Sequence, residues 1–298
     1  MSLLTIKEMD HALMKEVVDL AQSLKKEGNR KREDLKGKVL ISLYEKPSTR
    51  TRLSFETAIE NVGGHCIVMD FKTSQISRGE TMADTARVLS RYCDVISARL
   101  FKHTDLEEIA KYATVPVINA LTDVEHPCQA LADMQTILEH GKQNGKLVYI
   151  GDAANNVANS LMLIAARYGM HVVLCGPDGY HPSAEYLEEV QKTGAKVEVT
   201  SDPAYAVKDA DVIYTDVWVS MGDEAEKQKR LEDLKAYQVN DELLAQAKSD
   251  AIVLHCLPAH RGEEISDSIM DGKYAAVWDQ AENRMWAQEA LMIKLLSK

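Results

Sequence analysis

Short apolar runs alternate with amphipathic stretches along nearly the whole chain, and this alternation restricts the fold more than any other feature of the sequence. The apolar runs are typical of buried strands, and the stretches between them carry apolar residues at helical spacing. The strand candidates are 39–43, 66–69, 95–98, 117–119, 147–150, 172–175, 197–199, 212–215, 252–254 and 276–278. This alternation predicts βαβ units, and therefore parallel sheets in an α/β fold.

The candidates form a series of four strands and a series of six, which predicts two doubly wound α/β domains. A helical run over 129–140 and a polar segment over 141–146 separate the two series. We therefore expect a first domain over 1–138 and a second over 139–281, with a C-terminal helix over 282–298 that packs back on the first. A closed (β/α)₈ barrel is the rival architecture at this length. The mid-chain helix and the polar break favour two domains.

Charge and composition argue against several classes of partner. The 298 residues include 35 Lys and Arg and 46 Asp and Glu, so the net charge is 35 − 46 = −11, and no long basic run is present. Nucleic-acid binding needs a clustered cationic surface, so we expect no nucleic-acid partner. A few well-placed arginines on an acidic protein still suffice for a local anion site.

Cysteine usage and hydropathy indicate the compartment. The five cysteines are odd in number and form no C-x-x-C pair, so neither a disulfide framework nor a zinc site is expected. The beginning of the chain is polar, and no apolar run approaches the ~18–20 residues that span a bilayer. Acidic residues with metal-ligand spacing are not found. We expect a cytoplasmic protein without a metal, a cofactor or a membrane partner.

Polar residues follow six of the predicted strands, at the point where each strand ends. They are Arg99, 126–129, 151–156, 216–222, 255–258 and 279–284. Ligands of open parallel sheets bind at the carboxyl ends of the strands. These placements predict one composite active site in a cleft between the two domains.

The stretch from Ser48 to Thr51 lies where a predicted strand ends and an amphipathic helix begins. The N-terminus of a helix offers unpaired N–H groups and a positive dipole end, which suit an anion. Arg50 adds a planar fork of donors that matches phosphate oxygens. The stretch therefore predicts a phosphate site. The alternative is a plain Ser/Thr helix cap with surface arginines.

The other motifs are individually weaker. The turn after Gly151 lacks the second and third glycines of a dinucleotide loop, so we expect no nucleotide there. The amides of Asn155 and Asn156 suit a zwitterion, and we expect one of them to cap the following helix. His126 and Gln129 have donors that suit a carbonyl oxygen. Cys256 fits a small apolar residue better than a nucleophile.

Four of these motifs together resemble the signatures of the aspartate/ornithine carbamoyltransferase family. They are 45–52, 126–129, 216–222 and 255–258, and they occur in the family's order. The resemblance runs from about Leu35 to the C-terminus, and 220–222 and 256–257 are more particular to the ornithine branch. It implies a carbamoyl-phosphate-binding first domain, an ornithine-binding second domain, and a homotrimer or a higher assembly of trimers.

The resemblance also implies roles for individual residues. Those matching carbamoyl-phosphate contacts are Ser48, Thr49, Arg50, Thr51, Gln75, Arg99, His126, Gln129, Cys256, Leu257 and Arg284. Those matching ornithine contacts are Asn156, Asp216, Ser220 and Met221. The catalytic subset is Arg50, Arg99, His126, Cys256 and Arg284. Gln75 matches a residue that family members lend to a neighbouring subunit. Cys128 replaces the threonine of the family's His-Pro-Thr-Gln motif, which leaves His126 and Gln129 intact.

The resemblance implies transfer of the carbamoyl group of carbamoyl phosphate to the δ-amine of L-ornithine, giving citrulline and phosphate, within arginine metabolism and amino-acid biosynthesis. A carbamoyltransferase that acts on putrescine or another amine is the closest alternative. A non-catalytic ligand sensor on the same fold and a nicotinamide dehydrogenase are more distant ones. An assay for citrulline separates these possibilities.

Overall fold

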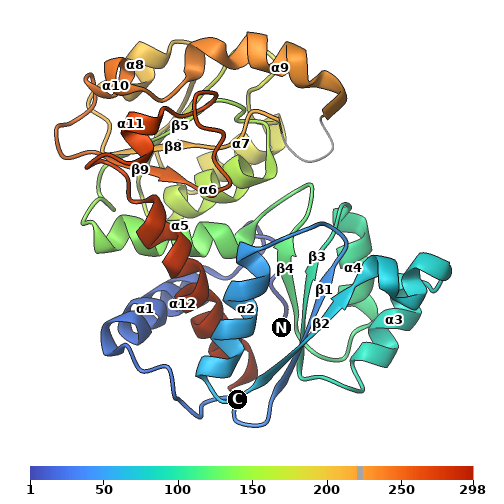
Figure 1. Cartoon of the computed structure of the whole chain (residues 1–298). Coiled ribbons are helices and arrows are strands. Elements are labelled where there is room, and N and C mark those ends of the chain that lie inside the picture. The colour runs from blue at the N-terminus through green and yellow to red at the C-terminus, as the bar shows by residue number, and fades with distance from the viewer. Residues whose placement is uncertain (220–223, 298) are drawn as a thin grey trace. The chain divides into compact units, whose positions relative to one another are not determined.

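The computed structural model describes residues 1–219 and 224–297 as two compact α/β units (Figure 1). The first unit comprises Met1–Gln135 and Glu282–Lys298, and the second comprises Thr136–Ala281. Each unit contains one open parallel sheet, so the closed barrel is wrong and the doubly wound α/β prediction is confirmed. Among the described helices, none is long and apolar enough to cross a membrane.

The first unit is built on a four-stranded parallel sheet with the strand order β2-β1-β3-β4. Its strands are β1 Val39–Tyr44, β2 His65–Asp70, β3 Val95–Arg99 and β4 Val117–Leu121. Strands β3 and β4 are buried throughout and β1 nearly so, as expected for parallel strands covered on both faces. Strands β2 and β3 lie on opposite sides of β1 in the sheet. The switch point, at which the strand order reverses, therefore lies between β1 and β3.

Helices cover the sheet of the first unit. They are α1 His11–Glu27, α2 Arg50–Asn61, α3 Met82–Leu89, α4 His103–Tyr112, the start of α5 Pro127–Glu139 and most of α12 Val277–Leu296, with the short 3₁₀ helices η1 Phe71–Thr73 and η2 Gln75–Arg78. Local signals explain their ends: the Asp10 carboxylate caps α1, and Gly28 ends it at a φ of 63°. Helix α2 directly follows β1, which brings its N-terminus to the switch point.

The second unit has a five-stranded parallel sheet with the order β7-β6-β5-β8-β9. Its strands are β5 Lys146–Ile150, β6 His171–Cys175, β7 Val197–Thr200, β8 Val212–Thr215 and β9 Ile252–His255. Its helices are α6 Asn156–Arg167, α7 Ala184–Lys192, α8 Pro203–Val207, α9 Lys227–Leu234, α10 Asp241–Leu244 and α11 Asp267–Met270, with η3 Glu224–Glu226 and η4 Lys235–Tyr237. The switch point of this sheet lies between β5 and β8.

One predicted strand is wrong. Residues 276–278 do not form a tenth strand, because Ala275 makes a single bridge to Val253 and helix α12 begins at Val277. Ala276 and Val277 are buried, and a short buried apolar run has the same pattern in a strand and in the first turn of a helix. The C-terminal helix therefore begins five residues before the predicted start, and Arg284 lies on this helix as predicted.

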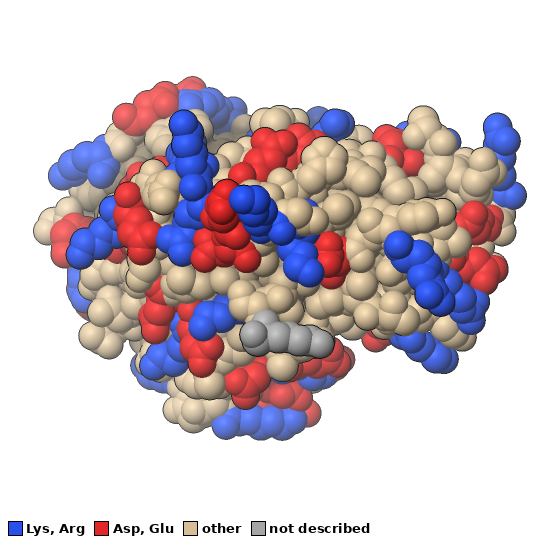
Figure 2. Space-filling view, turned by 90° about the horizontal axis from the view of Figure 1, so that it is seen from below, with Lys and Arg blue, Asp and Glu red and all other residues tan. Residues whose placement is uncertain are grey.

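Charged residues of both signs are mixed over the surface seen in Figure 2. Lys and Arg side chains lie next to Asp and Glu side chains on this face. Some ion pairs of the described residues lie within a helix at the surface, such as Arg52 with Glu56 and Arg87 with Asp84. This face therefore lacks the continuous basic surface that nucleic-acid binding requires.

Candidate active site

Buried cationic side chains gather at the switch point of the first unit. The Arg284 guanidinium on α12 donates from Nη1 to Gln129 Oε1 at 2.6 Å and from Nη2 to Thr51 Oγ1 at 3.4 Å. Arg99, the last residue of β3, donates from Nη1 to the same Thr51 hydroxyl at 3.4 Å. All four side chains are less than a tenth exposed. Two buried guanidinium groups that meet at one hydroxyl make a site for an anion, because their charge is expensive to bury without one.

The N-terminus of α2 adds backbone donors to this cationic site. Thr49 is the N-cap residue, and its side chain makes no capping hydrogen bond with any described residue. Ser48 and Arg50 are half-buried, whereas Thr49 is exposed. Thr49 therefore occupies the N-cap position without the side-chain bond that a plain Ser/Thr cap makes. The first turn of α2 retains the donors and the dipole that favour an anion.

His126 lies beside Arg284, just before α5 begins. Its Nε2 is 3.5 Å from Arg284 Nη1. Burial, and then the charges of Arg284 and Arg99, hold the pKa of His126 well below its usual value. The imidazole is therefore neutral at physiological pH, and it can offer a hydrogen bond without proton transfer. Cys128, two residues on, donates to the Asn119 carbonyl at 3.4 Å, and burial raises its pKa to about 12.

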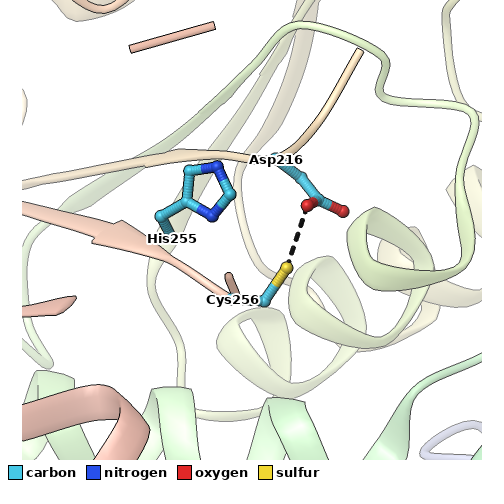
Figure 3. A group of neighbouring side chains, drawn as sticks. All are labelled: Asp216, His255 and Cys256. Atoms are coloured by element: carbon cyan, nitrogen blue, oxygen red, sulfur yellow. Dashed lines mark hydrogen bonds between the residues drawn. The ribbon is translucent and has the colours of Figure 1, made fainter. Parts of the chain in front are cut away.

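The second unit brings Asp216, His255 and Cys256 together (Figure 3). Asp216 follows β8, His255 ends β9, and the thiol of Cys256 donates to Asp216 Oδ1 at 2.9 Å. The same carboxylate oxygen accepts the Val217 N–H at 2.8 Å. Burial raises the pKa of Asp216 above its usual value, although the thiol and the Val217 N–H counteract part of the shift. The thiol acts as a donor here, which fits orientation of the carboxylate and argues against a thiolate nucleophile.

A buried His–Glu pair supports the segment after β9. His255 Nε2 lies 2.9 Å from Glu264 Oε1, and both side chains are fully buried. His255 Nδ1 accepts the Leu257 N–H at 2.9 Å, which assigns the proton of the neutral ring to Nε2. Leu257 has a φ of 61°, a conformation that a branched residue rarely adopts without support. The pair therefore holds a strained backbone next to Cys256. The sequence analysis missed Glu264, which no motif singled out.

The types of residue around Asp216 also suit a metal ion. Asp216, His255 and Cys256 each place one ligand atom within 4.8 Å of the others, and His260, Glu263 and Glu264 form a second such group in the described part of the chain. However, both ring nitrogens of His255 already have hydrogen-bond partners, and the thiol of Cys256 is bonded to Asp216. A metal at the first group would have to break one of these bonds, so the hydrogen bonding does not favour it.

The turn after β5 lies at the switch point of the second unit. Asn155 caps α6 by accepting the Ala158 N–H at 2.8 Å, and its amide donates to the Tyr149 hydroxyl at 2.8 Å. The prediction that one asparagine caps the helix is thereby confirmed. Asn156 is the first residue of α6 and is half-buried, so it lies at the positive end of the helix dipole.

An ion pair that the sequence analysis missed connects this turn to α9. Arg230 donates from Nη1 to Asp152 Oδ2 at 2.7 Å and to the Trp218 carbonyl at 3.2 Å. Its guanidinium also lies over the ring of Tyr180, 5.4 Å from the ring centre. Arg230 thus ties together the segment after β8, the turn after β5 and α9.

Not every predicted site residue joins these two groups. Gln75 is exposed on η2 and takes no part in the hydrogen bonds around Arg284. Leu257 follows Cys256 and is half-buried. Ser220 and Met221 lie outside the described residues. The predicted residues thus form one cationic group in the first unit and one group with a carboxylate and a thiol in the second.

Two family models match successive parts of the chain. Residues 1–139 match the carbamoyl-P binding domain of aspartate/ornithine carbamoyltransferases, and residues 143–295 match the Asp/Orn binding domain of the same family. The chain is 55% identical to an ornithine carbamoyltransferase of Oceanobacillus iheyensis over 94% of this chain and 89% of the relative. It is 52% identical to an anabolic ornithine carbamoyltransferase of Pyrococcus furiosus, over 87% of this chain and 84% of that relative.

A solved structure agrees with these sequence matches. The ornithine carbamoyltransferase from Pyrococcus furiosus superimposes with a TM-score of 0.92 at 48% identity, covering 98% of this chain and 95% of that one. Fold and sequence therefore point to the same relatives along nearly the full length of the chain.

Proposed function

The chain belongs to the aspartate/ornithine carbamoyltransferase family, and we propose that it transfers the carbamoyl group of carbamoyl phosphate to the δ-amine of L-ornithine, giving citrulline and phosphate. The observation that carries this proposal is the buried group of Thr51, Arg99, His126, Gln129 and Arg284 in the unit that matches a carbamoyl-phosphate-binding domain. Such a group suits a doubly charged, activated acyl donor.

Carbamoyl phosphate is assigned to the first unit. The N-terminus of α2 and Arg50 hold the phosphate together with Ser48, Thr49 and Thr51, because backbone N–H groups, hydroxyls and a guanidinium match its oxygens. Arg99, His126, Gln129 and Arg284 contact the carbamoyl end. Gln75 reaches the site of a neighbouring subunit.

Ornithine is assigned to the second unit. Asn156, Asp216, Ser220 and Met221 hold the amino acid, and Cys256 and Leu257 contact the carbamoyl group during transfer. Asn156 lies at the N-terminus of α6, which favours a carboxylate. The buried Asp216 carboxylate, oriented by the Cys256 thiol, offers an acceptor to an amine.

The reaction proceeds by direct attack of the neutral δ-amine on the carbamoyl carbon. The new C–N bond forms as the C–O bond to phosphate breaks, and the proton that the amine loses ends on the phosphate product. Negative charge builds on the carbonyl oxygen, where Thr51, Arg99 and neutral His126 donate hydrogen bonds as an oxyanion hole does. Alkylamines are mostly protonated at neutral pH, so activity rises with pH as the amine becomes neutral.

A colorimetric citrulline assay tests the proposal directly. The chain is incubated with carbamoyl phosphate and either ornithine or putrescine. Citrulline from ornithine, with much slower transfer to putrescine, supports the proposal. If ornithine yields no citrulline while the protein is folded, the proposal is wrong.

Arg50→Ala is expected to lower kcat/KM for carbamoyl phosphate by about 2 kcal/mol, or roughly thirtyfold, which is the scale of one hydrogen bond to a charged group. Steady-state kinetics with varied carbamoyl phosphate measure the effect. Arg52→Ala is the matched control, because Arg52 pairs with Glu56 on the exposed side of the same helix. Equal effects of the two substitutions on kcat/KM would show that Arg50 does not bind the phosphate.

Arg230→Gln is expected to raise the KM for ornithine by about tenfold and to leave the KM for carbamoyl phosphate unchanged, because it breaks one charged hydrogen bond that fixes the turn before Asn156. Kinetics with each substrate varied in turn give the two constants. Arg261→Gln serves as control, since Arg261 pairs with Asp267 and Asp271 on the surface of the same unit. A rise in both KM values would contradict a specific role at the ornithine site.

Assembly and compartment complete the proposal. We assign the chain to a homotrimer in the cytoplasm that acts in arginine biosynthesis; the name of the Pyrococcus relative, which calls it anabolic, supports the biosynthetic direction. Large apolar side chains are exposed on the first unit: Leu53, Ile67, Val88, Tyr92 and Phe101. Exposed apolar residues near an edge strand often mark a subunit interface. Light scattering coupled to size exclusion measures the number of subunits.

A further inference from the structure

The amide of Gln129 is held by a guanidinium at one end and by a carboxyl group at the other. Its Oε1 accepts from Arg284 Nη1 at 2.6 Å, and its Nε2 donates to Asp133 Oδ1 at 2.7 Å. Asp133 lies four residues after Gln129 on α5, which places the two side chains on the same face of the helix. All three side chains are almost fully buried.

A carboxylate next to an amide fixes which way the amide points. The two ends of a glutamine amide have nearly the same shape, but one end donates and the other accepts. Nε2 donates to the Asp133 carboxyl oxygen, and Oε1 accepts from the guanidinium, which can only donate, so each end of the amide faces a group with which it can bond. The reversed amide would place an oxygen against the carboxylate and an N–H against the guanidinium. Both buried hydrogen bonds would be lost.

The orientation of Gln129 matters because it determines where the guanidinium of Arg284 lies. Arg284 Nη1 donates to Gln129 at 2.6 Å, whereas His126 and Thr51 lie 3.5 Å and 3.4 Å from the same guanidinium. A shift of the amide therefore displaces the cation from the group that we assign to carbamoyl phosphate. Effects of this kind reach the ligand without any direct contact.

We propose that Asp133 is a positioning residue for the carbamoyl-phosphate site: it fixes the amide of Gln129, which in turn holds the Arg284 guanidinium in place for the ligand. Asp133 does not touch the ligand in this arrangement. The identity of the ligand rests on the proposed function, whereas the chain of hydrogen bonds from Asp133 to Arg284 does not.

Binding of inorganic phosphate tests the inference without turnover. Asp133→Ala removes the acceptor and is expected to weaken phosphate binding, measured by calorimetry, by about tenfold. Asp133→Asn keeps an oxygen that accepts from Gln129, so this variant is expected to lose less phosphate affinity than Asp133→Ala. Gln129→Ala should weaken phosphate binding as much as Asp133→Ala does. The double substitution should weaken it little more than either single one. Additive losses, or an Asp133→Asn variant as weak as Asp133→Ala, would overturn the inference.

A charge-neutral exchange keeps the test decisive if Asp133→Ala fails to fold. Gln129→Glu alone places two carboxylates side by side and should impair phosphate binding. Combining it with Asp133→Asn restores a donor opposite a carboxylate, with the polarity of the hydrogen bond reversed and the net charge unchanged. Recovery of binding, and of the KM for carbamoyl phosphate, is expected in this double variant. If the double variant does not recover phosphate binding, the inference is contradicted. It is also contradicted if the wild type does not bind phosphate.

The two proposals fail in distinguishable ways. If the wild type forms no citrulline but the phosphate affinities show the expected coupling, the proposed function is wrong and the role of Asp133 stands. If citrulline is formed but the couplings are absent, the role of Asp133 is wrong and the proposed function stands.

Discussion

Arg284→Ala is expected to lower kcat/KM for carbamoyl phosphate by at least about a thousandfold, or about 4 kcal/mol. The substitution removes a buried cation that bonds to Gln129, lies beside His126 and shares the Thr51 hydroxyl with Arg99. Each hydrogen bond to a charged group contributes about 1.5–3 kcal/mol, and the charge that builds during transfer depends on several of them at once. Steady-state kinetics with carbamoyl phosphate varied at saturating ornithine measure the loss.

A matched control lies on the same helix. Lys294 pairs with Glu16 at the other end of α12, so Lys294→Ala changes the charge of the helix without touching the site. Arg284→Lys separates charge from geometry, because an ammonium lacks the planar fork of the guanidinium. We expect Lys294→Ala to be near normal and Arg284→Lys to be intermediate. A loss of less than about tenfold in Arg284→Ala would exclude Arg284 from transition-state stabilisation.

The parts of the fold that the sequence predicts are those with a regular hydrophobic period. Strand β1 is an apolar run interrupted only by Ser42, and it was predicted to within one residue of its end. The strand predicted over 276–278 is wrong because Ala276 and Val277 are buried where a helix begins, and burial there gives the same pattern as in a strand. The hydrophobic period of a short run shows that its residues are buried. Only the length of the element then distinguishes a strand from a helix.

The residues that support the site escaped prediction for a different reason. Glu264 meets His255 through an irregular segment, and Arg230 meets Asp152 from far along the chain, so no spacing rule connects these pairs. Asp133 follows Gln129 at helical spacing, but the sequence does not say that both side chains face the interior. Residues that resemble a family motif were found, whereas the charged residues that orient them require the three-dimensional structure.

Helices α2 and α12 lie side by side in the first unit and are joined by polar contacts near both ends of α2 (Figure 1). One contact is the Thr51–Arg284 hydrogen bond at the site. The other joins Asn61, at the end of α2, to Glu289 on α12, where Asn61 Nδ2 donates to Glu289 Oε2 at 3.1 Å. Glu289 is fully buried, so its charge state affects the packing of the helix that carries Arg284.

Burial raises the pKa of Glu289 from about 4.5 to about 7, against the opposing effects of the Asn61 hydrogen bond and of the charges on Arg32 and Arg30, while Asp34 adds to the rise. Between these two values the folded protein binds more protons than the unfolded chain. The free energy of unfolding therefore falls as the pH rises through this window. The contribution of Glu289 is fully present below about pH 4.5 and is lost above about pH 7.

Glu289→Gln is expected to remove this pH dependence, because glutamine keeps the acceptor for Asn61 and cannot ionise. The shift of roughly 2.5 pKa units corresponds to at most about 3.4 kcal/mol, so at pH 8 the variant should unfold several degrees above the wild type. At pH 4.5 the two proteins should unfold at nearly the same temperature. Thermal unfolding at a series of pH values measures the difference, with Glu60→Gln on the exposed side of α2 as control. A difference between the variant and the wild type that stays constant from pH 4.5 to pH 8 would show that Glu289 does not titrate in this window.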